Sequence, residues 1–399
     1  MSHSTIDPSM STTMKKTVIA IVALGLPLTF AISAFGQSSM SLSGVIDEGF
    51  DITNNSNPHG DSLYQFQSGY LQSNIVTLGG IEDLGGGKKL TFVIKTTFDI
   101  NSGRSAPGRS FIGLSDDKRG TVTVGRQYDL VIDYLAPTTA NGNWGGWLLS
   151  HPMDNDNTDG SFLVNNAIKY ASPEFAGFKF GGMYAFSNNT KFANDRLYSL
   201  GAQYLHGPLL VAAAYLQTNN PGAQNSGATP AGNANFTAAR LRIFGAGINY
   251  TIGSATLGFV YSNTDVRDPV SSSYLSDPSG NPLPLAIAGV ALNQLKFQNL
   301  EVNAMYQATP FFFVGAQYVY TLVEGDASGA SVKPRYHTVG LMADYMLSKR
   351  TDIYVQGAYE KVAGDRTGSV LDNAAIPGAG GISSTTSQIA FRTGIRHKF

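Results

Sequence analysis

The sequence of 399 residues contains no cysteine and only two tryptophans, and charged residues make up just 14% of it. The lack of cysteine excludes a disulfide framework, a thiol nucleophile and a zinc–thiolate site. The formal net charge of −1 at pH 7 provides no basic excess for a nucleic-acid partner. No second long apolar run follows residue 36, which excludes a helical membrane protein.

The start of the chain has the pattern of an export signal. Lys15 and Lys16 precede an apolar run over 18–35, which closes on Ala34-Phe-Gly36. A basic pair, an apolar stretch and a small-x-small site are the three parts of a secretory signal. We expect residues 1–36 to be an N-terminal extension and cleaved signal peptide, and residues 37–399 to be the folded protein.

The last twelve residues, 388–399, alternate strictly and end on an aromatic side chain. Ile389 and Phe391 share the apolar parity, whereas Arg392 and Arg396 share the other. Side chains in a strand point alternately to opposite faces. In an outer-membrane barrel the apolar face meets lipid and the charged face lines water.

Segments with the same two-residue repeat recur along the whole chain. In 88–100, Leu90, Phe92 and Ile94 share one face, and Lys95 lies on the other. Connections alternate between short turns and long loops rich in Gly, Pro, Ser and Asn, as expected for periplasmic turns and outer loops. The pattern predicts an all-β fold, a 16-stranded antiparallel transmembrane β-barrel with an aqueous lumen. The expected strands lie near 40–53, 64–83, 88–100, 107–116, 119–126, 165–173, 176–188, 194–206, 208–219, 236–252, 253–266, 292–308, 311–325, 333–348, 350–363 and 386–399.

An ordered set of short motifs spans nearly the whole chain and resembles the Gram-negative general diffusion porins of the betaproteobacterial type. The motifs are Gly44-Val-Ile-Asp47, Glu82-Asp-Leu-Gly-Gly-Gly87, Phe111-Ile-Gly-Leu114, Gly120-Thr-Val-Thr-Val-Gly-Arg-Gln127, His151-Pro-Met-Asp-Asn-Asp156, Asn165-Asn-Ala-Ile-Lys-Tyr170 and Arg396-His-Lys-Phe399. The resemblance implies an outer-membrane channel for passive diffusion of small hydrophilic solutes and ions, without a cofactor or metal. It also implies a homotrimer in contact with outer-membrane lipid and lipopolysaccharide, with Phe399 as the assembly signal for the barrel assembly machinery.

The resemblance further implies that loop 3, from 127 to about 160, folds inward as a constriction. Asp129 and Asp133 are four residues apart and would share a face if this stretch is a short helix. Carboxylates that reach into a pore favour cations, although both acids could instead be solvated loop or cap residues. The expected pore charges are Lys95, Asp99, Arg126, Asp129, Asp133, Lys169 and Lys179, some of which could instead pair with one another along the wall.

The wall that faces loop 3 departs from the pattern of the resembled family. The family usually carries arginines at positions that here hold Ile75, Gly108 and Leu163. Arg109 could replace one of them, but a shift of one residue aims it at the other face unless a β-bulge intervenes. The sequence therefore predicts a weakly charge-selective pore in which Lys95 matters most.

Three other functions are weighed against this interpretation. An outer-membrane enzyme needs a nucleophile beside a base, and none of the six histidines has a nucleophile motif next to it. A secreted β-sandwich would also show alternating strands. Within the channel class, the alternative is a substrate-selective porin for a small organic acid or another solute.

Overall fold

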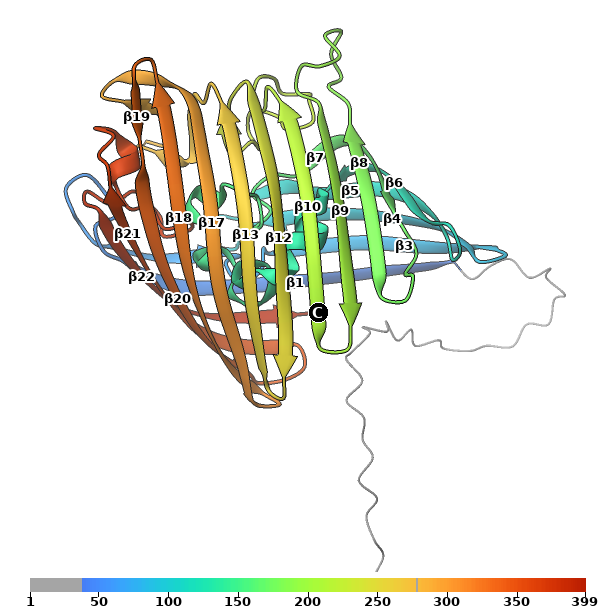
Figure 1. Cartoon of the computed structure of the whole chain (residues 1–399). Helices are drawn as coiled ribbons and strands as arrows, with labels where there is room; N and C mark the ends of the chain where they lie inside the picture. The colour runs from blue at the N-terminus through green and yellow to red at the C-terminus, as the bar shows by residue number, and fades with distance from the viewer. Residues whose placement is uncertain (1–37, 278) are drawn as a thin grey trace, which may run out of the picture. The chain divides into compact units, whose positions relative to one another are not determined.

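The computed structural model describes residues 38–277 and 279–399. These residues form a closed antiparallel β-barrel (Figure 1), which confirms the expected fold class. The expected export signal in 1–36 lies outside the described residues. In the part of the chain that is described, every helix is too short or too polar to cross a membrane.

Sixteen wall segments run round the barrel, and the ring closes where the last strand pairs with the first. At this closure Asp51 lies opposite Arg392, and Ile52 lies opposite Phe391. The wall consists of β1 (Ser39–Thr53), β2 (Leu63–Ser68) with β3 (Ile75–Gly85), β4 (Lys88–Phe98), β5 (Ser105–Asp116), β6 (Gly120–Gln127), β7 (Val164–Ala171), β8 (Phe178–Ala185), β9 (Leu197–His206), β10 (Leu209–Asn219), β12 (Arg240–Ile252), β13 (Ala255–Arg267), β17 (Val290–Thr309), β18 (Phe312–Ala327), β20 (Pro334–Met346), β21 (Thr351–Gly364) and β22 (Ser387–Lys398).

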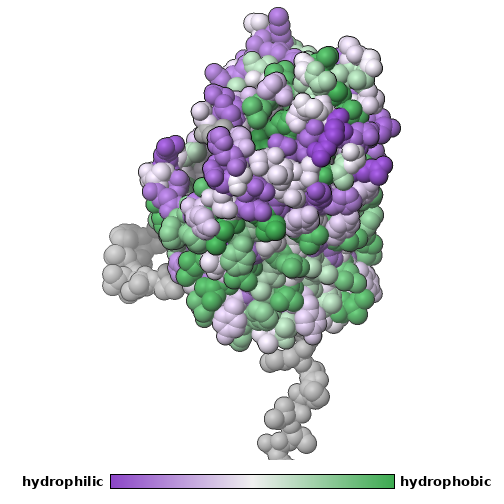
Figure 2. Space-filling view, turned by 90° about the vertical axis from the view of Figure 1, so that its left-hand side faces the viewer, coloured by the Kyte–Doolittle hydropathy of each residue, from purple (hydrophilic) through white to green (hydrophobic). Residues whose placement is uncertain are grey.

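The two-residue repeat separates an outer apolar face from an inner polar one. On β22, Ile389 and Phe391 are about half exposed, whereas Gln388 and Arg392 are fully buried on the inner side. A space-filling view from one side shows hydrophobic residues gathered over the lower part of the wall and hydrophilic residues above them (Figure 2). An apolar band of this kind is the surface that a transmembrane barrel presents to lipid.

One expected strand, 64–83, is interrupted. Residues 69–74 leave the ladder, so β1 pairs with β2 on one side of the gap and with β3 on the other. Gly69 adopts a φ of 82°, a left-handed conformation that favours glycine. The Asp47 side chain stabilises the gap by accepting a hydrogen bond from the Gln72 N–H at 2.7 Å. The prediction of one continuous strand was wrong because the alternation of side chains carries no sign of this turn.

The long outer loops contain a second, smaller sheet. It comprises β11 (Phe236–Thr237), β14 (Ser271–Ser276) and β15 (Pro282–Pro284). Three short segments, β16 (Ala286–Ile287), β19 (Ala330–Val332) and the 3₁₀ turn η6 (Val370–Asp372), complete these loops.

Candidate pore constriction

Loop 3, residues 128–163, folds into the barrel between β6 and β7 and is visible inside the wall (Figure 1). It follows the inner wall from β8 to β20, since Leu130 packs at Gly181 and Leu149 packs at Gly340. The loop is a chain of short helical turns: η1 (Val131–Leu135), η2 (Ala136–Thr138), η3 (Asn141–Gly145), η4 (Trp147–Leu149) and η5 (Pro152–Asp154). The structure therefore places loop 3 inside the lumen, as the fold prediction required.

Glycines on the wall make room for this loop. A Cβ at Gly315 of β18 would lie 2.5 Å from the Trp144 ring, and one at Gly340 of β20 would lie 2.6 Å from the Leu149 side chain. Any larger residue at these positions would have to displace the loop. The wall at β18 and β20, which we call the far side of the lumen, is thus shaped to hold loop 3 closely.

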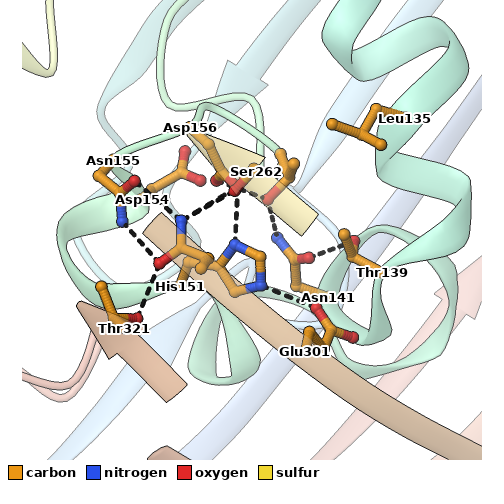
Figure 3. Close-up of polar contacts among 12 residues, drawn as sticks. Leu135, Thr139, Asn141, His151, Asp154, Asn155, Asp156, Ser262, Glu301 and Thr321 are labelled. Atoms are coloured by element: carbon orange, nitrogen blue, oxygen red, sulfur yellow. Dashed lines mark hydrogen bonds and ion pairs between the residues drawn. The ribbon is translucent and has the colours of Figure 1, made fainter. Parts of the chain in front are cut away.

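A buried polar cluster fixes loop 3 to this far side (Figure 3). His151 of the loop lies between two carboxylates, with Nδ1 2.7 Å from Asp156 and Nε2 2.8 Å from Glu301 of β17. Asp156 also accepts a hydrogen bond from the Ser262 hydroxyl of β13 at 2.5 Å. All four side chains are fully buried. We call His151, Asp156, Ser262 and Glu301 the anchor cluster.

The His151 charge offsets part of the negative charge of the two carboxylates in the anchor cluster. Burial alone would lower the pKa of His151, but Asp156 and Glu301 outweigh it and hold that pKa well above its ordinary value. Burial likewise opposes ionisation of Asp156, yet the His151 charge and its hydrogen bonds keep the pKa of Asp156 below its usual range. A charged imidazolium therefore bridges two carboxylates from different parts of the fold.

The composition of the anchor cluster is similar to that of a catalytic triad, but the order of its members differs. A triad needs a serine hydroxyl hydrogen-bonded to the imidazole. Here Asp156 stands between Ser262 and His151, and none of the three is accessible to a solute. The arrangement explains how the loop is held in place.

The open passage lies on the opposite side, between loop 3 and the wall formed by 69–75 and β4–β5. It is a cavity of about 960 Å³, which we call the constriction cavity. Lys95, Arg104 and Arg109 line it from the wall, and Asp99 and Asp159 also line it. None of the three cations forms an ion pair within the described residues. The Arg109 guanidinium lies 4.9 Å from the centre of the Tyr128 ring.

A β-bulge brings Arg109 into this cavity. In the β4–β5 ladder Ile94 pairs with Ser110 and Thr96 pairs with Pro107, so Lys95 alone lies opposite two residues. Those two residues, Gly108 and Arg109, both line the cavity. From the sequence, Arg109 could face inward only if a β-bulge intervened, and this is such a bulge.

The three positions at which the resembled family carries arginine all line the constriction cavity. They are Ile75, Gly108 and Leu163. A Cβ at Gly108 would lie 2.9 Å from the Lys95 carbonyl oxygen, so a side chain does not fit there. The cavity thus has the expected place in the fold, with uncharged residues where the resembled family carries arginine and with positive charge supplied by Lys95, Arg104 and Arg109.

The pore residues proposed from the sequence fall into different environments. Lys95 and Asp99 line the constriction cavity. Asp129 is fully buried in loop 3, where burial raises its pKa to about 6. Asp133 forms an ion pair with Lys169 at 2.6 Å, and both are partly buried.

The last two proposed pore charges and the proposed assembly signal lie away from the cavity lining. Arg126 donates hydrogen bonds to Asn165 and Asn233. Lys179 pairs with Glu174 at 3.0 Å near the β7–β8 turn. Phe399 continues the β22 pairing, because its N–H donates to the Gly44 carbonyl at 3.1 Å.

Sequence reasoning did not identify several residues of the cavity. Arg104 lies in the β4–β5 turn, and Tyr274 comes from β14 in a distant outer loop. Trp147 lies on loop 3, with its ring centre 5.4 Å from that of Tyr70 in the β2–β3 gap. The rarity of tryptophan was the one available signal, because both tryptophans, Trp144 and Trp147, occur in this loop.

Asp159 is the carboxylate of loop 3 that faces the cavity. Burial raises its pKa to about 7. Its neighbour Asp154 is fully buried, and burial together with repulsion from Asp159 raises the pKa of Asp154 well above its ordinary value. Near neutral pH the two acids therefore carry less than their full negative charge.

The comparisons with known proteins agree with this geometry. The sequence pattern of the Gram-negative porin family matches residues 18–365. An outer membrane porin protein of Bordetella pertussis is 28% identical over 388 residues, covering 87% of this chain and 94% of that protein. Outer membrane porin protein 32 of Delftia acidovorans is 27% identical over 405 residues, covering 97% of this chain and 100% of that one.

Solved structures share the fold. An anion-selective porin from Comamonas acidovorans superposes with a TM-score of 0.68 at 23% identity, covering 91% of this chain and 100% of that chain. OmpT of Vibrio cholerae superposes with a TM-score of 0.61 at 16% identity. The family pattern, the barrel and the inward-folded loop lead to one conclusion: this chain belongs to the Gram-negative porins and forms a channel through the outer membrane.

Proposed function

We propose that small hydrophilic solutes and ions cross this porin through the constriction cavity, with a modest preference for anions. The observation that carries the proposal is the charge of the cavity lining. Three cations without ion-pair partners, Lys95, Arg104 and Arg109, face two carboxylates, Asp99 and Asp159. The surplus of positive charge is small, so the preference is expected to be small.

Charges in this cavity act on a passing ion with little screening. The Debye length is about 8 Å at physiological ionic strength, so an ion confined between loop 3 and the β4–β5 wall remains within reach of these charges. The paired residues contribute less, because Lys169 and Asp133 neutralise each other outside the cavity lining. The same holds for Lys179 and Glu174.

The test is the reversal potential of the purified channel in a planar bilayer under a KCl gradient. We expect a potential of the sign that indicates chloride preference. Replacing Lys95, Arg104 and Arg109 together by glutamine should remove the chloride preference and, since Asp99 and Asp159 remain, shift the potential toward potassium preference. Lys179→Gln should leave the potential unchanged. Potassium preference in the native channel would contradict the proposal.

We also propose that the chain forms a homotrimer through the wall around β1 and β2. The four most exposed large apolar side chains among the described residues, Met40, Leu42, Tyr64 and Phe66, all lie on these two strands. Among the described residues β2 pairs with β1 alone, so its other edge has no strand partner there. An exposed edge beside apolar side chains is a surface that a second copy can cover.

Mass measurement in mild detergent tests the trimer. We expect a native assembly of three chains that resists SDS until it is heated. Phe66→Glu should yield monomers, whereas Phe66→Leu should not. A native protein that is monomeric in mild detergent at every concentration would contradict the proposal.

Two further proposals concern export and assembly. The first is that residues 1–36 are cleaved during export, so that the mature chain starts at Gln37. The intact mass of the outer-membrane protein tests this. Phe399 serves as the signal for the barrel assembly machinery, supported by its terminal position beside Gly44. Deleting Phe399 should reduce outer-membrane abundance far more than Lys398→Gln, and equal abundance would contradict it.

A further inference from the structure

The constriction cavity has an apolar lining as well as a charged one. Its apolar and aromatic members come from the wall and from two loops. They include Ile75, Tyr128, Ile132, Trp147, Leu163 and Tyr274. Simple inorganic ions gain nothing from apolar surface, so this lining indicates solutes with an apolar body.

Tyr274 brings a second loop to the constriction. Its hydroxyl group accepts a hydrogen bond from the Trp147 indole at 3.2 Å and lies 2.5 Å from the Ser161 hydroxyl. Trp147 and Ser161 belong to loop 3, whereas Tyr274 lies on β14. These bonds fix the aromatic ring at the edge of the cavity, so it forms part of a preformed surface.

The cations line the same cavity as this surface. The bulge puts Gly108 and Arg109 opposite Lys95, so two cationic side chains project into the cavity from neighbouring positions on adjacent strands. Arg109 also lies over the Tyr128 ring, which keeps its guanidinium beside an aromatic face. A solute that enters here meets positive charge and aromatic surface at the same time.

We propose that the constriction cavity binds small aromatic carboxylates, with the carboxylate at Lys95 and Arg109 and the ring against Tyr274 and Trp147. The inference rests on the proposed anion preference and adds a substrate class to it. A phosphate ion would satisfy the cations but leave the apolar lining uncovered. A neutral aromatic solute would cover the lining but leave the cations unpaired.

The experiment measures chloride current through the native channel in a planar bilayer while a test solute is added. The carboxylates are added as sodium salts. Benzoate should reduce the current saturably at millimolar concentration. Acetate supplies the carboxylate without the ring, and benzyl alcohol supplies a ring without the charge. We expect acetate to bind about threefold to tenfold more weakly, the range that an aromatic contact contributes. Benzyl alcohol should also bind more weakly than benzoate, because it leaves the cations without a charged partner.

Substitutions at Tyr274 separate the ring from its hydroxyl group. Tyr274→Phe keeps the ring and should retain block by benzoate, whereas Tyr274→Ser should weaken that block about threefold or more without changing block by acetate. Tyr250→Ser, on the exposed outer face of β12, is the matched control and should change neither. Equal block in Tyr274→Ser and native channels would overturn the role assigned to Tyr274.

The outcomes separate this inference from the proposed function. A native channel that prefers chloride but is blocked equally by benzoate and acetate overturns the aromatic carboxylate site and leaves the anion preference standing. A native channel without chloride preference overturns the proposed function itself. Because the salts are compared on the native protein, the test does not depend on any variant folding.

Discussion

The two sides of the lumen treat charge in opposite ways. On the far side, the His151 imidazolium lies between Asp156 and Glu301, each of which contacts it, and none of the three has exposed surface. On the open side, Lys95 and Arg109 lie beside each other with no carboxylate partner among the described residues. The first arrangement resembles the interior of a protein, and the second resembles a binding site for an anionic solute.

The contrast shows which charges are available to a solute. The charges of a fully buried pair attract each other within the fold and cannot contact a solute. Removing one partner leaves the other charge buried without compensation. Unpaired cations in water are free to interact with whatever passes. Variants of the far side should therefore change stability, and variants of the open side should change selectivity.

The largest expected effect follows from breaking the paired side. His151→Ala leaves Asp156 and Glu301 buried without their cation and should lower the free energy of unfolding by about 3–5 kcal/mol. Urea unfolding in lipid vesicles measures this loss. Single-channel recordings should also show larger and noisier currents, since loop 3 loses one of its attachments to β17.

The control for the paired side is Lys179→Ala, which breaks an exposed pair with Glu174. Exposed pairs contribute about 0–1 kcal/mol, so this variant should unfold close to the native midpoint. If His151→Ala unfolds and conducts like the native protein, other contacts hold the loop and the distinction between the two sides fails.

Reversing one charge on the open side should produce the next largest effect. Lys95→Glu replaces a cation with an anion inside the constriction cavity and should shift the reversal potential toward potassium preference. Arg109→Glu should act comparably, because the bulge brings both residues into the same cavity. Lys179→Glu should leave the potential near its native value, and a native response in all three would remove Lys95 and Arg109 from the filter.

A smaller effect is expected from pH. Burial raises the pKa of Asp159 to about 7, so lowering the pH from 8 to 6 protonates it and removes negative charge from the cavity. Chloride preference should therefore increase as the pH falls through this range. Asp159→Asn should reduce the change.

Asp99 provides the control for pH. Hydrogen bonds from the Ser102 hydroxyl and the Asn101 N–H hold the pKa of this exposed turn carboxyl below its ordinary value, so it stays ionised between pH 6 and 8. Asp99→Asn should shift the reversal potential by a constant amount and keep its dependence on pH. A pH response of native size in Asp159→Asn would locate the main titrating group elsewhere.

The barrel could be predicted from the sequence because lipid imposes one strict rule on every strand. Residues such as Ile389 and Phe391 must face outward, and the rule repeats from strand to strand. The gap at 69–74 could not be predicted, because it depends on Asp47 and on loop 3, which lie far away in the sequence. Parity also placed Arg392 in the open lumen, whereas the structure buries it against Asp51.

The site was less accessible to sequence reasoning than the fold. Parity placed Lys95 on the inner face, and the structure puts it in the cavity lining. The direction of Arg109 depended on a bulge, which changes pairing without changing composition. The role of His151 could not be predicted, since nothing beside it in the sequence indicates Glu301, its partner 150 positions away.

The glycines that line the path of loop 3 have a consequence for the order of assembly. The loop, complete by residue 163, rests on Gly315 and Gly340 of strands made much later in the chain. Loop 3 cannot reach its final position before β18 and β20 are in place, so a partly assembled barrel has no constriction. During refolding, protection of loop 3 from protease should appear together with the heat-resistant form. Earlier protection would show that the loop adopts its shape without the wall.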